Sequence, residues 1–183
     1  MDRRIHILGG SGSGTTTLGE GLSRELGIRH LDMDAFYWKK TAVPFTEKVA
    51  VEDRLDAIED SIAGVDEWVL SGSLCGWGEA LIERFTHVVF LWVPWEVRRA
   101  RLRARSIERH GVDALAEGGE MFTVDRDFME WASRYDSAGF EQRSRRTHDA
   151  WIEALPDRIR VVRIEGEMGV GDVVGRVLDS LWV

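Results

Sequence analysis

The sequence predicts an α/β fold, in which one parallel sheet of five strands carries helices on both of its faces. Three observations support this prediction. Short apolar runs alternate with amphipathic segments, the first apolar run ends in a glycine-rich turn, and 183 residues are enough for one complete core but few for two. We therefore expect a single domain over residues 1–183, without internal repeats.

The order of the elements follows from the spacing of apolar residues. Strand-like runs cover residues 5–8, 28–31, 68–70, 87–93 and 158–164. Helical spacing covers residues 15–26, 47–62, 79–85, 94 to about 109, 124–135, 140–155 and 171–181. The polar, glycine-bearing stretch 111–119 predicts a connection between two of these helices.

The charge and composition of the chain limit its partners. With 24 basic and 32 acidic residues the net charge is −8, which argues against nonspecific binding of nucleic acid. No stretch approaches the roughly 18 apolar residues that a membrane span needs, and the N-terminus has no apolar run of signal-peptide length. Cys75 is the only cysteine, so it forms no internal disulfide. We expect a cytoplasmic protein that binds neither nucleic acid nor a membrane.

Arginines are concentrated in one part of this acidic chain. Six lie between Arg98 and Arg109, and Arg134, Arg143, Arg145 and Arg146 follow. Such a concentration is typical of a protein that binds a small anion. The alternative is a solvated helix face whose arginines pair with carboxylates. The sequence leaves both interpretations open for each single arginine.

The segment after the first strand carries the clearest motif. It matches the phosphate-binding loop G-x-x-x-x-G-K-[ST] except at one position: Gly9 and Gly14 have the right spacing, Thr16 supplies the hydroxyl, and Thr15 replaces the lysine. The glycines let successive N–H groups turn towards phosphate oxygens, and the following helix adds its positive end. We expect the loop to hold the phosphates of ATP, or of another nucleoside triphosphate, through Gly9, Ser11, Gly12, Ser13, Gly14, Thr15, Thr16 and Thr17.

Two alternative interpretations of this loop fit less well. A flexible glycine–serine linker would not stand between a buried strand and an amphipathic helix. The dinucleotide-binding pattern G-x-G-x-x-G fails, because after Gly12 and Gly14 the third glycine position holds Thr17. The missing lysine has a chemical consequence, since loss of one preorganised donor costs roughly 10²–10³ in rate unless another cation substitutes. Binding of the nucleotide depends less on this lysine than catalysis does, because backbone amides form most of the phosphate-binding site.

Two acidic residues follow the second strand-like run. Asp32 and Asp34 are two positions apart at a strand end, so both side chains can face one cleft. We assign to Asp34 the acceptance of a proton from an acceptor hydroxyl, and to Asp32 the binding of Mg²⁺ together with the Thr16 hydroxyl. The alternative is that the two carboxylates only form a turn or cap the next helix.

Two arginines of the long helix are candidate catalytic cations. Arg101 and Arg105 are four positions apart and share one helix face, which would point at the loop if the following segment folded over it. The alternative is surface pairing with Glu96 or Glu108.

These motifs together resemble the small P-loop kinases of the adenylate kinase and shikimate kinase type. More closely, they are similar to the adenylate-kinase-like bacterial proteins described as ATPase or topology modulator. The resemblance covers nearly the whole chain in element order. It implies a three-layer P-loop fold with a helical lid inserted at about residues 106–145, arginines 101 and 105 beside the nucleotide phosphates, and residues 164–166 near the adenine base. Ser71 stands where the family has the aspartate that holds magnesium through water.

Two functional hypotheses follow. The first is a phosphotransferase that moves the γ-phosphoryl group of ATP, with Mg²⁺, to a small-molecule or nucleotide acceptor. Tyr37, Trp38 and Trp77 would border that acceptor, which favours one with a ring or an apolar part. The second is a nucleotide-binding module with little or no catalysis, because Thr15 and Ser71 both lack the usual charge. A loop that binds only an inorganic anion or another nucleotide is a third possibility.

Overall fold

The computed structural model describes residues 2–41 and 47–181. It contains a five-stranded sheet in the order β2-β3-β1-β4-β5, and each neighbouring pair of strands is parallel. The strands are β1 (Arg4–Gly9), β2 (Arg29–Asp32), β3 (Trp68–Ser71), β4 (His87–Trp92) and β5 (Arg160–Glu165). The predicted α/β class is confirmed. Because β1 is the central strand, the loop that follows it lies in the middle of the carboxyl edge of the sheet, where open parallel sheets bind ligands.

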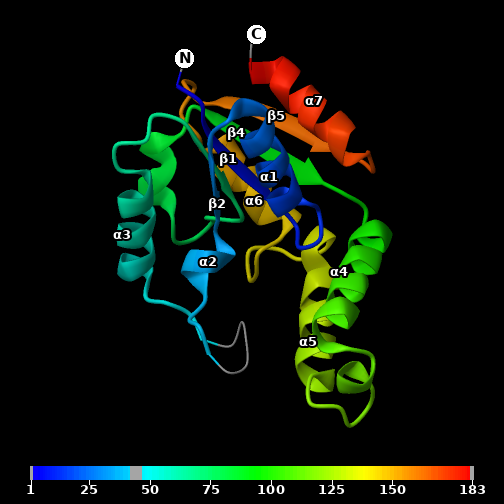
Figure 1. Ribbon diagram of the computed structural model, residues 1–183. Helices are drawn as coiled ribbons and strands as arrows, with labels where there is room; N and C mark the ends of the chain where they lie inside the picture. The colour runs from blue at the N-terminus through cyan, green and yellow to red at the C-terminus, as the bar shows by residue number, and fades with distance from the viewer. Residues whose placement is uncertain (1, 42–46, 182–183) are drawn as a thin grey trace.

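Helices cover both faces of this sheet (Figure 1). One face carries α1 (Thr15–Leu26) and α7 (Val170–Leu181), and the other carries α3 (Val51–Ile62), α6 (Arg145–Glu153) and the 3₁₀ helix η1 (Glu79–Arg84). Side chains of β1 alternate between the two cores: Ile5 and Ile7 pack with the α1 side, and Leu8 packs with the α3 and α6 side. A central strand buried on both faces requires this apolar character at successive positions.

A helical hairpin projects from the carboxyl edge of the sheet beyond β4 (Figure 1). It consists of α4 (Trp95–His110) and α5 (Phe122–Ser133), joined through the short turn η2 (Asp113–Leu115), and the turn η3 (Arg134–Asp136) leads back towards α6. The hairpin occupies the region where the resemblance places a lid. Among the described residues, no helix combines the length and the apolar character needed to cross a membrane.

Two helices begin later than predicted, and one short helix was not predicted. The helix predicted at 47–62 begins only at Val51, because Lys48 instead forms a bridge with Trp38; positions 42–46 lie outside the described residues. A short helix α2 (Asp34–Tyr37) was not predicted, since four residues carry no periodicity. The helix predicted at 140–155 is shortened to α6, because Ser144 caps its N-terminus.

The cap of α6 gives a testable stability effect. The Ser144 hydroxyl accepts from the Thr147 N–H at 3.1 Å and donates to the Gly139 carbonyl at 2.6 Å, and Ser144 is completely buried. We expect Ser144→Ala to lower the free energy of unfolding by about 1–2 kcal/mol, because it removes the cap and leaves buried backbone groups unpaired. Urea unfolding followed by circular dichroism measures the change. The control Ser137→Ala, at an exposed serine with a 3.4 Å bond, should change the stability by less than about 0.5 kcal/mol, and equal effects would contradict the prediction.

Candidate nucleotide-binding site

The predicted phosphate loop connects the end of β1 to the start of α1. Its turn is closed by a hydrogen bond from the Ser13 N–H to the Gly10 carbonyl at 3.0 Å. Gly12 and Gly14 have φ angles of 82° and 101°, a conformation that residues with a Cβ rarely adopt. No side chain caps α1 at Gly14, so the first N–H groups of this helix have no capping partner from the protein. An uncapped helix N-terminus behind a glycine-rich turn is suited to bind an anion.

Close packing explains why the first residue of the loop has no side chain. A Cβ on Gly9 would lie 2.5 Å from the Leu91 carbonyl oxygen and 2.5 Å from the Ser13 hydroxyl oxygen. The loop therefore packs directly on β4, and any larger residue at this position would displace it. Thr15, Thr16 and Thr17 follow in the first turn of α1, and Thr17 is exposed.

Two arginines from the hairpin region contact the loop. Arg101 Nη1 donates to the Ser13 carbonyl at 3.3 Å, and Arg143 Nη2 donates to the Ser11 hydroxyl at 3.2 Å. Burial lowers the pKa of Arg143, and the negative charge of Asp34 opposes this shift. Arg143 was only one of several weaker candidates in the sequence, whereas in the structure it is bonded to the loop and its charge acts on Asp34.

The acidic pair follows the second strand: Asp32 is the last residue of β2, and Asp34 is the first residue of α2. The Asp32 carboxylate accepts from the Asp34 N–H at 3.0 Å, so the turn predicted as an alternative role is present as well. Desolvation and the charge of Asp32 raise the pKa of Asp34, and the guanidinium groups of Arg143 and Arg105 oppose this rise. The charge of Arg105 thus acts on the acidic pair. Within the described residues, neither Arg101 nor Arg105 forms an ion pair with Glu96 or Glu108.

Ser71 is completely buried at the end of β3. Its hydroxyl is hydrogen-bonded to His30 Nε2 at 2.9 Å, and the His30 ring packs against Gly19 of α1. Burial lowers the pKa of His30. The Ser71 hydroxyl is therefore bonded to a side chain of the protein, and unlike a carboxylate it brings no charge.

A pocket of about 190 Å³ lies between the loop and the connection from β5 to α7. Its walls are mainly apolar and include Leu91, Arg101, Ile164, Gly166, Met168 and Val173. The resemblance places the adenine base at residues 164–166, and the pocket has the apolar lining that a flat base needs.

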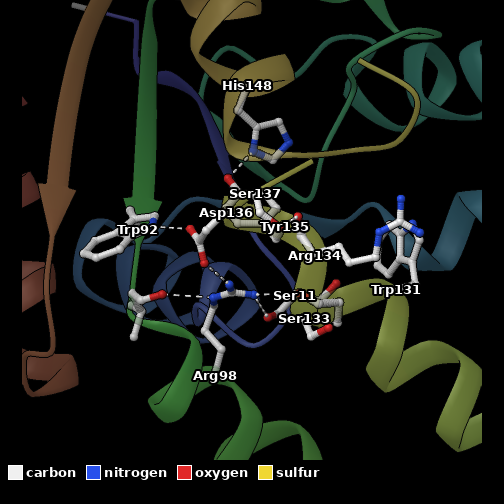
Figure 2. A network of polar contacts seen from close by, with 12 residues as sticks. Ser11, Trp92, Arg98, Trp131, Ser133, Arg134, Tyr135, Asp136, Ser137 and His148 are labelled. Atoms are coloured by element: carbon white, nitrogen blue, oxygen red, sulfur yellow. Dashed lines mark hydrogen bonds and ion pairs between the residues drawn. The ribbon is translucent and has the colours of Figure 1, made fainter. Parts of the chain in front are cut away.

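Sequence reasoning missed a polar network behind the loop (Figure 2). Arg98 forms a 2.7 Å ion pair with Asp136, and Tyr135 and His148 share a 2.7 Å hydrogen bond. Arg98 and Leu102 are four positions apart on the buried face of α4, and this spacing was the available signal that Arg98 is buried. The same spacing indicated that Arg54 is buried, because it lies four positions before buried Ile58 in α3. The Arg54 guanidinium lies 4.0 Å from the centre of the Tyr37 ring.

Magnesium would depend on few protein ligands. In the described part of the chain, no group of three or more His, Cys, Asp and Glu side chains could hold a metal ion. Mg²⁺ bound to nucleotides usually takes one or two carboxylate or hydroxyl ligands and completes its shell with phosphate oxygens and water. Thr16 in the first turn of α1 and Asp32 at the end of β2 fit that limited requirement.

The central loop, the parallel sheet and the helical hairpin define a P-loop protein of the small-kinase class. Residues 5–123 match the model of an AAA domain family, AAA_18, and the chain belongs to this family. The chain is 44% identical over 181 residues to the uncharacterized protein YqaC of Bacillus subtilis (strain 168), covering 99% of this chain and 98% of that protein. The predicted resemblance to small P-loop kinases is confirmed.

Solved structures share this fold at low sequence identity. Shikimate kinase from Bacteroides thetaiotaomicron has a TM-score of 0.57 and 20% identity, covering 99% of both chains. Shikimate kinase from Aquifex aeolicus has a TM-score of 0.53 and 20% identity, covering 97% of this chain and 95% of that one. A sugar kinase from Janibacter has a TM-score of 0.53 and 16% identity, covering 99% and 95%. These similarities establish the architecture.

Cys75, beside the β3 end, offers a simple probe of the site. Burial raises the pKa of its thiol to about 11, although a hydrogen bond with Ser73 opposes the rise. A raised thiol pKa means less thiolate at neutral pH, so alkylation by iodoacetamide at pH 8 should be about 100-fold slower than in urea-unfolded protein. Mass spectrometry of time points measures both rates, with glutathione as the reagent control. Equal rates in folded and unfolded protein would contradict the prediction.

Proposed function

We propose that this protein binds ATP, or another nucleoside triphosphate, with Mg²⁺ and transfers the γ-phosphoryl group to a small-molecule or nucleotide acceptor. The observation that carries the proposal is the position of Arg143: it donates a hydrogen bond to Ser11 of the loop, and its charge also acts on the Asp34 carboxylate. A phosphate held by the loop and a hydroxyl held by Asp34 would therefore meet beside one guanidinium group.

Binding uses the backbone of the loop. N–H groups from Ser11 to Thr17 would hold the phosphates, and the 190 Å³ pocket would take the base. Thr16 and Asp32 would hold Mg²⁺, which would supply positive charge to offset the negative charge of the phosphates.

Transfer uses the acidic pair and the arginines. Asp34 accepts the proton of the acceptor hydroxyl, the hydroxyl oxygen forms a bond to the γ-phosphorus, and the bond from that phosphorus to the β–γ bridging oxygen breaks, which releases ADP. Arg101 donates to the loop and the charge of Arg105 acts on the acidic pair, so both would stabilise negative charge that develops during transfer. The hairpin region at about residues 106–145 acts as the lid that excludes water when both substrates are bound.

Aromatic side chains define the acceptor side. Tyr37 and Trp77 have ring centroids 5.8 Å apart, and the Arg54 guanidinium lies 4.0 Å from the centre of the first ring and 5.0 Å from that of the second. Arg54 is 5% exposed. This arrangement favours an acceptor that presents a ring or an apolar face together with its hydroxyl group.

A nucleotide-binding module with little turnover is the second candidate. Its support is the double loss of charge: Thr15 has no ammonium group, and the Ser71 hydroxyl is already bound to His30. Backbone amides would still bind ADP or ATP under this alternative.

A single-turnover experiment with γ-labelled ATP, Mg²⁺ and a panel of hydroxyl acceptors distinguishes the two candidates. The proposal expects label on one acceptor class, with only slow release of inorganic phosphate in its absence. Binding of ATP without transfer or hydrolysis under any condition would overturn the phosphotransferase and favour the binding module. A thermal unfolding temperature that rises with ADP concentration tests binding separately.

A further inference from the structure

Arg98 is completely buried in the first turn of α4. Two short hydrogen bonds anchor its guanidinium: Nη2 donates to Asp136 Oδ2 at 2.7 Å, and Nε donates to the Val93 carbonyl at 2.9 Å. The other oxygen of that carboxylate accepts from Trp92 Nε1 at 2.7 Å. Figure 2 shows the guanidinium between the Asp136 carboxylate and the loop. Because a buried charge requires such partners, the side chain has a fixed place behind the phosphate loop.

The remaining guanidinium nitrogen reaches the phosphate loop itself. Nη1 of Arg98 donates to the Ser11 carbonyl at 3.4 Å and to the Ala132 carbonyl at 3.4 Å. Both bonds are long, but a donor with no exposed surface has no water to bind instead. The main chain of Arg98 touches the next residue of the loop, since a Cβ on Gly12 would lie 2.9 Å from the Arg98 carbonyl oxygen. Arg98 therefore contacts both residues of the Ser11–Gly12 peptide unit.

Because the peptide unit between Ser11 and Gly12 is planar, the contact with Arg98 sets the direction of the Gly12 N–H group. The described residues contain no cis peptide bond, so the Ser11 carbonyl and the Gly12 N–H point in opposite directions. Arg98 holds the carbonyl on the α4 side, and the N–H of Gly12 consequently points away from α4. A charged donor on a carbonyl also polarises the peptide unit, which makes its N–H a stronger donor to an anion.

A second side chain supports the loop from the same side. The Tyr135 ring lies 3.0 Å from a Cβ placed on Gly10, and its hydroxyl is hydrogen-bonded to His148 Nδ1 at 2.7 Å. His148 Nε2 is in turn hydrogen-bonded to the Ser73 hydroxyl at 2.9 Å. The Arg98 guanidinium stacks 4.9 Å from the centre of the Tyr135 ring, which joins the two supports.

We propose that Arg98 is a positioning residue for the phosphate loop. It sets the direction of the Gly12 N–H group, and through its ion pair with Asp136 it makes that direction depend on the turn η3, where the hairpin returns to the sheet. Arg98 itself touches no ligand, because it lies buried behind the loop. The inference rests on the proposed function for the identity of the anion, a nucleotide phosphate.

The test compares Arg98→Met with Arg99→Met, which removes the same charge from an exposed neighbour on α4. Loss of a charged hydrogen bond that orients a binding group should raise the Kd for ADP about 10–100-fold in R98M and less than about 2-fold in R99M. Asp136→Asn keeps a polar partner for Arg98 but removes its charge, so the Kd for ADP should rise about 3–10-fold. Isothermal titration calorimetry measures these constants.

The second readout is the backbone amide resonance of Gly12 in two-dimensional NMR spectra, which a general loss of stability would not move by itself. In unliganded R98M and D136N this resonance should shift, while amides of the buried strand β4 keep their wild-type positions. R99M should leave the Gly12 resonance unchanged. Thermal unfolding shows whether each variant folds.

Two outcomes overturn the inference: a Kd for ADP in R98M within 2-fold of that in R99M, or an unchanged Gly12 resonance in R98M. If R98M does not fold, the Kd for ADP and the Gly12 resonance of D136N test the inference instead. If the wild-type protein binds no ADP, the proposed nucleotide function fails, and the Gly12 resonance in the unliganded variants still decides the role of Arg98.

Discussion

Asp34→Asn should lower the rate of phosphoryl transfer to the acceptor about 10²–10⁴-fold, the usual contribution of a general base. The asparagine keeps the size and polarity of the side chain but cannot take the proton of the attacking hydroxyl. The affinity for ADP should stay within about 3-fold, because the backbone of the loop, and not Asp34, would hold the phosphates. Rapid-quench measurement of transfer from γ-labelled ATP, at saturating acceptor, gives the rate.

The matched control is Asp66→Asn, which makes the same change of charge at an exposed residue in the turn before β3. It should transfer phosphate at the wild-type rate. A normal transfer rate in Asp34→Asn would show that Asp34 is not the proton acceptor, and the acidic pair would then be left with its structural role in the turn.

The pH dependence of transfer follows from the groups around Asp34. A general base acts when deprotonated, so the rate falls as the pH drops through the pKa of Asp34. Desolvation and Asp32 raise this pKa, while Arg143 and Arg105 lower it. The fall should therefore begin at a higher pH than for an ordinary carboxyl group. Arg105→Met should move the acid limb of the pH–rate profile to higher pH, because it removes a positive charge that lowers the pKa of Asp34; a shift to lower pH would contradict the assignment.

The features that the sequence predicted well are those with local causes. The loop follows from glycines at fixed spacing after an apolar run, and the sheet follows from apolar runs such as residues 87–93. The boundaries of α3 and α6 depended instead on single polar contacts, for example the Ser144 cap. Apolar spacing shows which face of a helix is buried, but it does not show where a polar group interrupts the pattern.

The same distinction between local motifs and distant contacts applies to the residues of the candidate site. Asp34 and Arg101 belong to recognisable motifs, and in the structure Arg101 is hydrogen-bonded to the loop while the charges of Arg143 and Arg105 act on Asp34. The buried position of Arg98 depends on Asp136, which lies 38 residues further along the chain. No local pattern joins two such residues, and only the folded hairpin brings their charges together. The partnership of Ser71 with His30 is hidden from the sequence for the same reason.

Thr15→Lys should raise the rate at which the γ-phosphoryl group leaves ATP about 10²–10³-fold, the effect of one preorganised donor on a developing negative charge. Position 15 is the first residue of α1, directly after Gly14, and the loop before it has the glycine spacing that the lysine-containing motif requires. The new ammonium group would therefore reach the β- and γ-phosphates without a change of the backbone. Single-turnover rates with γ-labelled ATP measure the gain.

Thr15→Met is the control for this variant, because it adds a long side chain without the charge and should give no gain.

The comparison also identifies what replaces the lysine in the natural protein. If Arg143 already supplies that charge, Arg143→Met should abolish wild-type transfer, and Thr15→Lys should restore it in the same chain. If the wild-type protein shows no transfer but Thr15→Lys does, the acidic pair and the arginines form a complete active site that lacks only one cation. A variant that binds ATP and shows no gain would contradict the expected rate increase, because then the missing ammonium group would not be what limits the reaction.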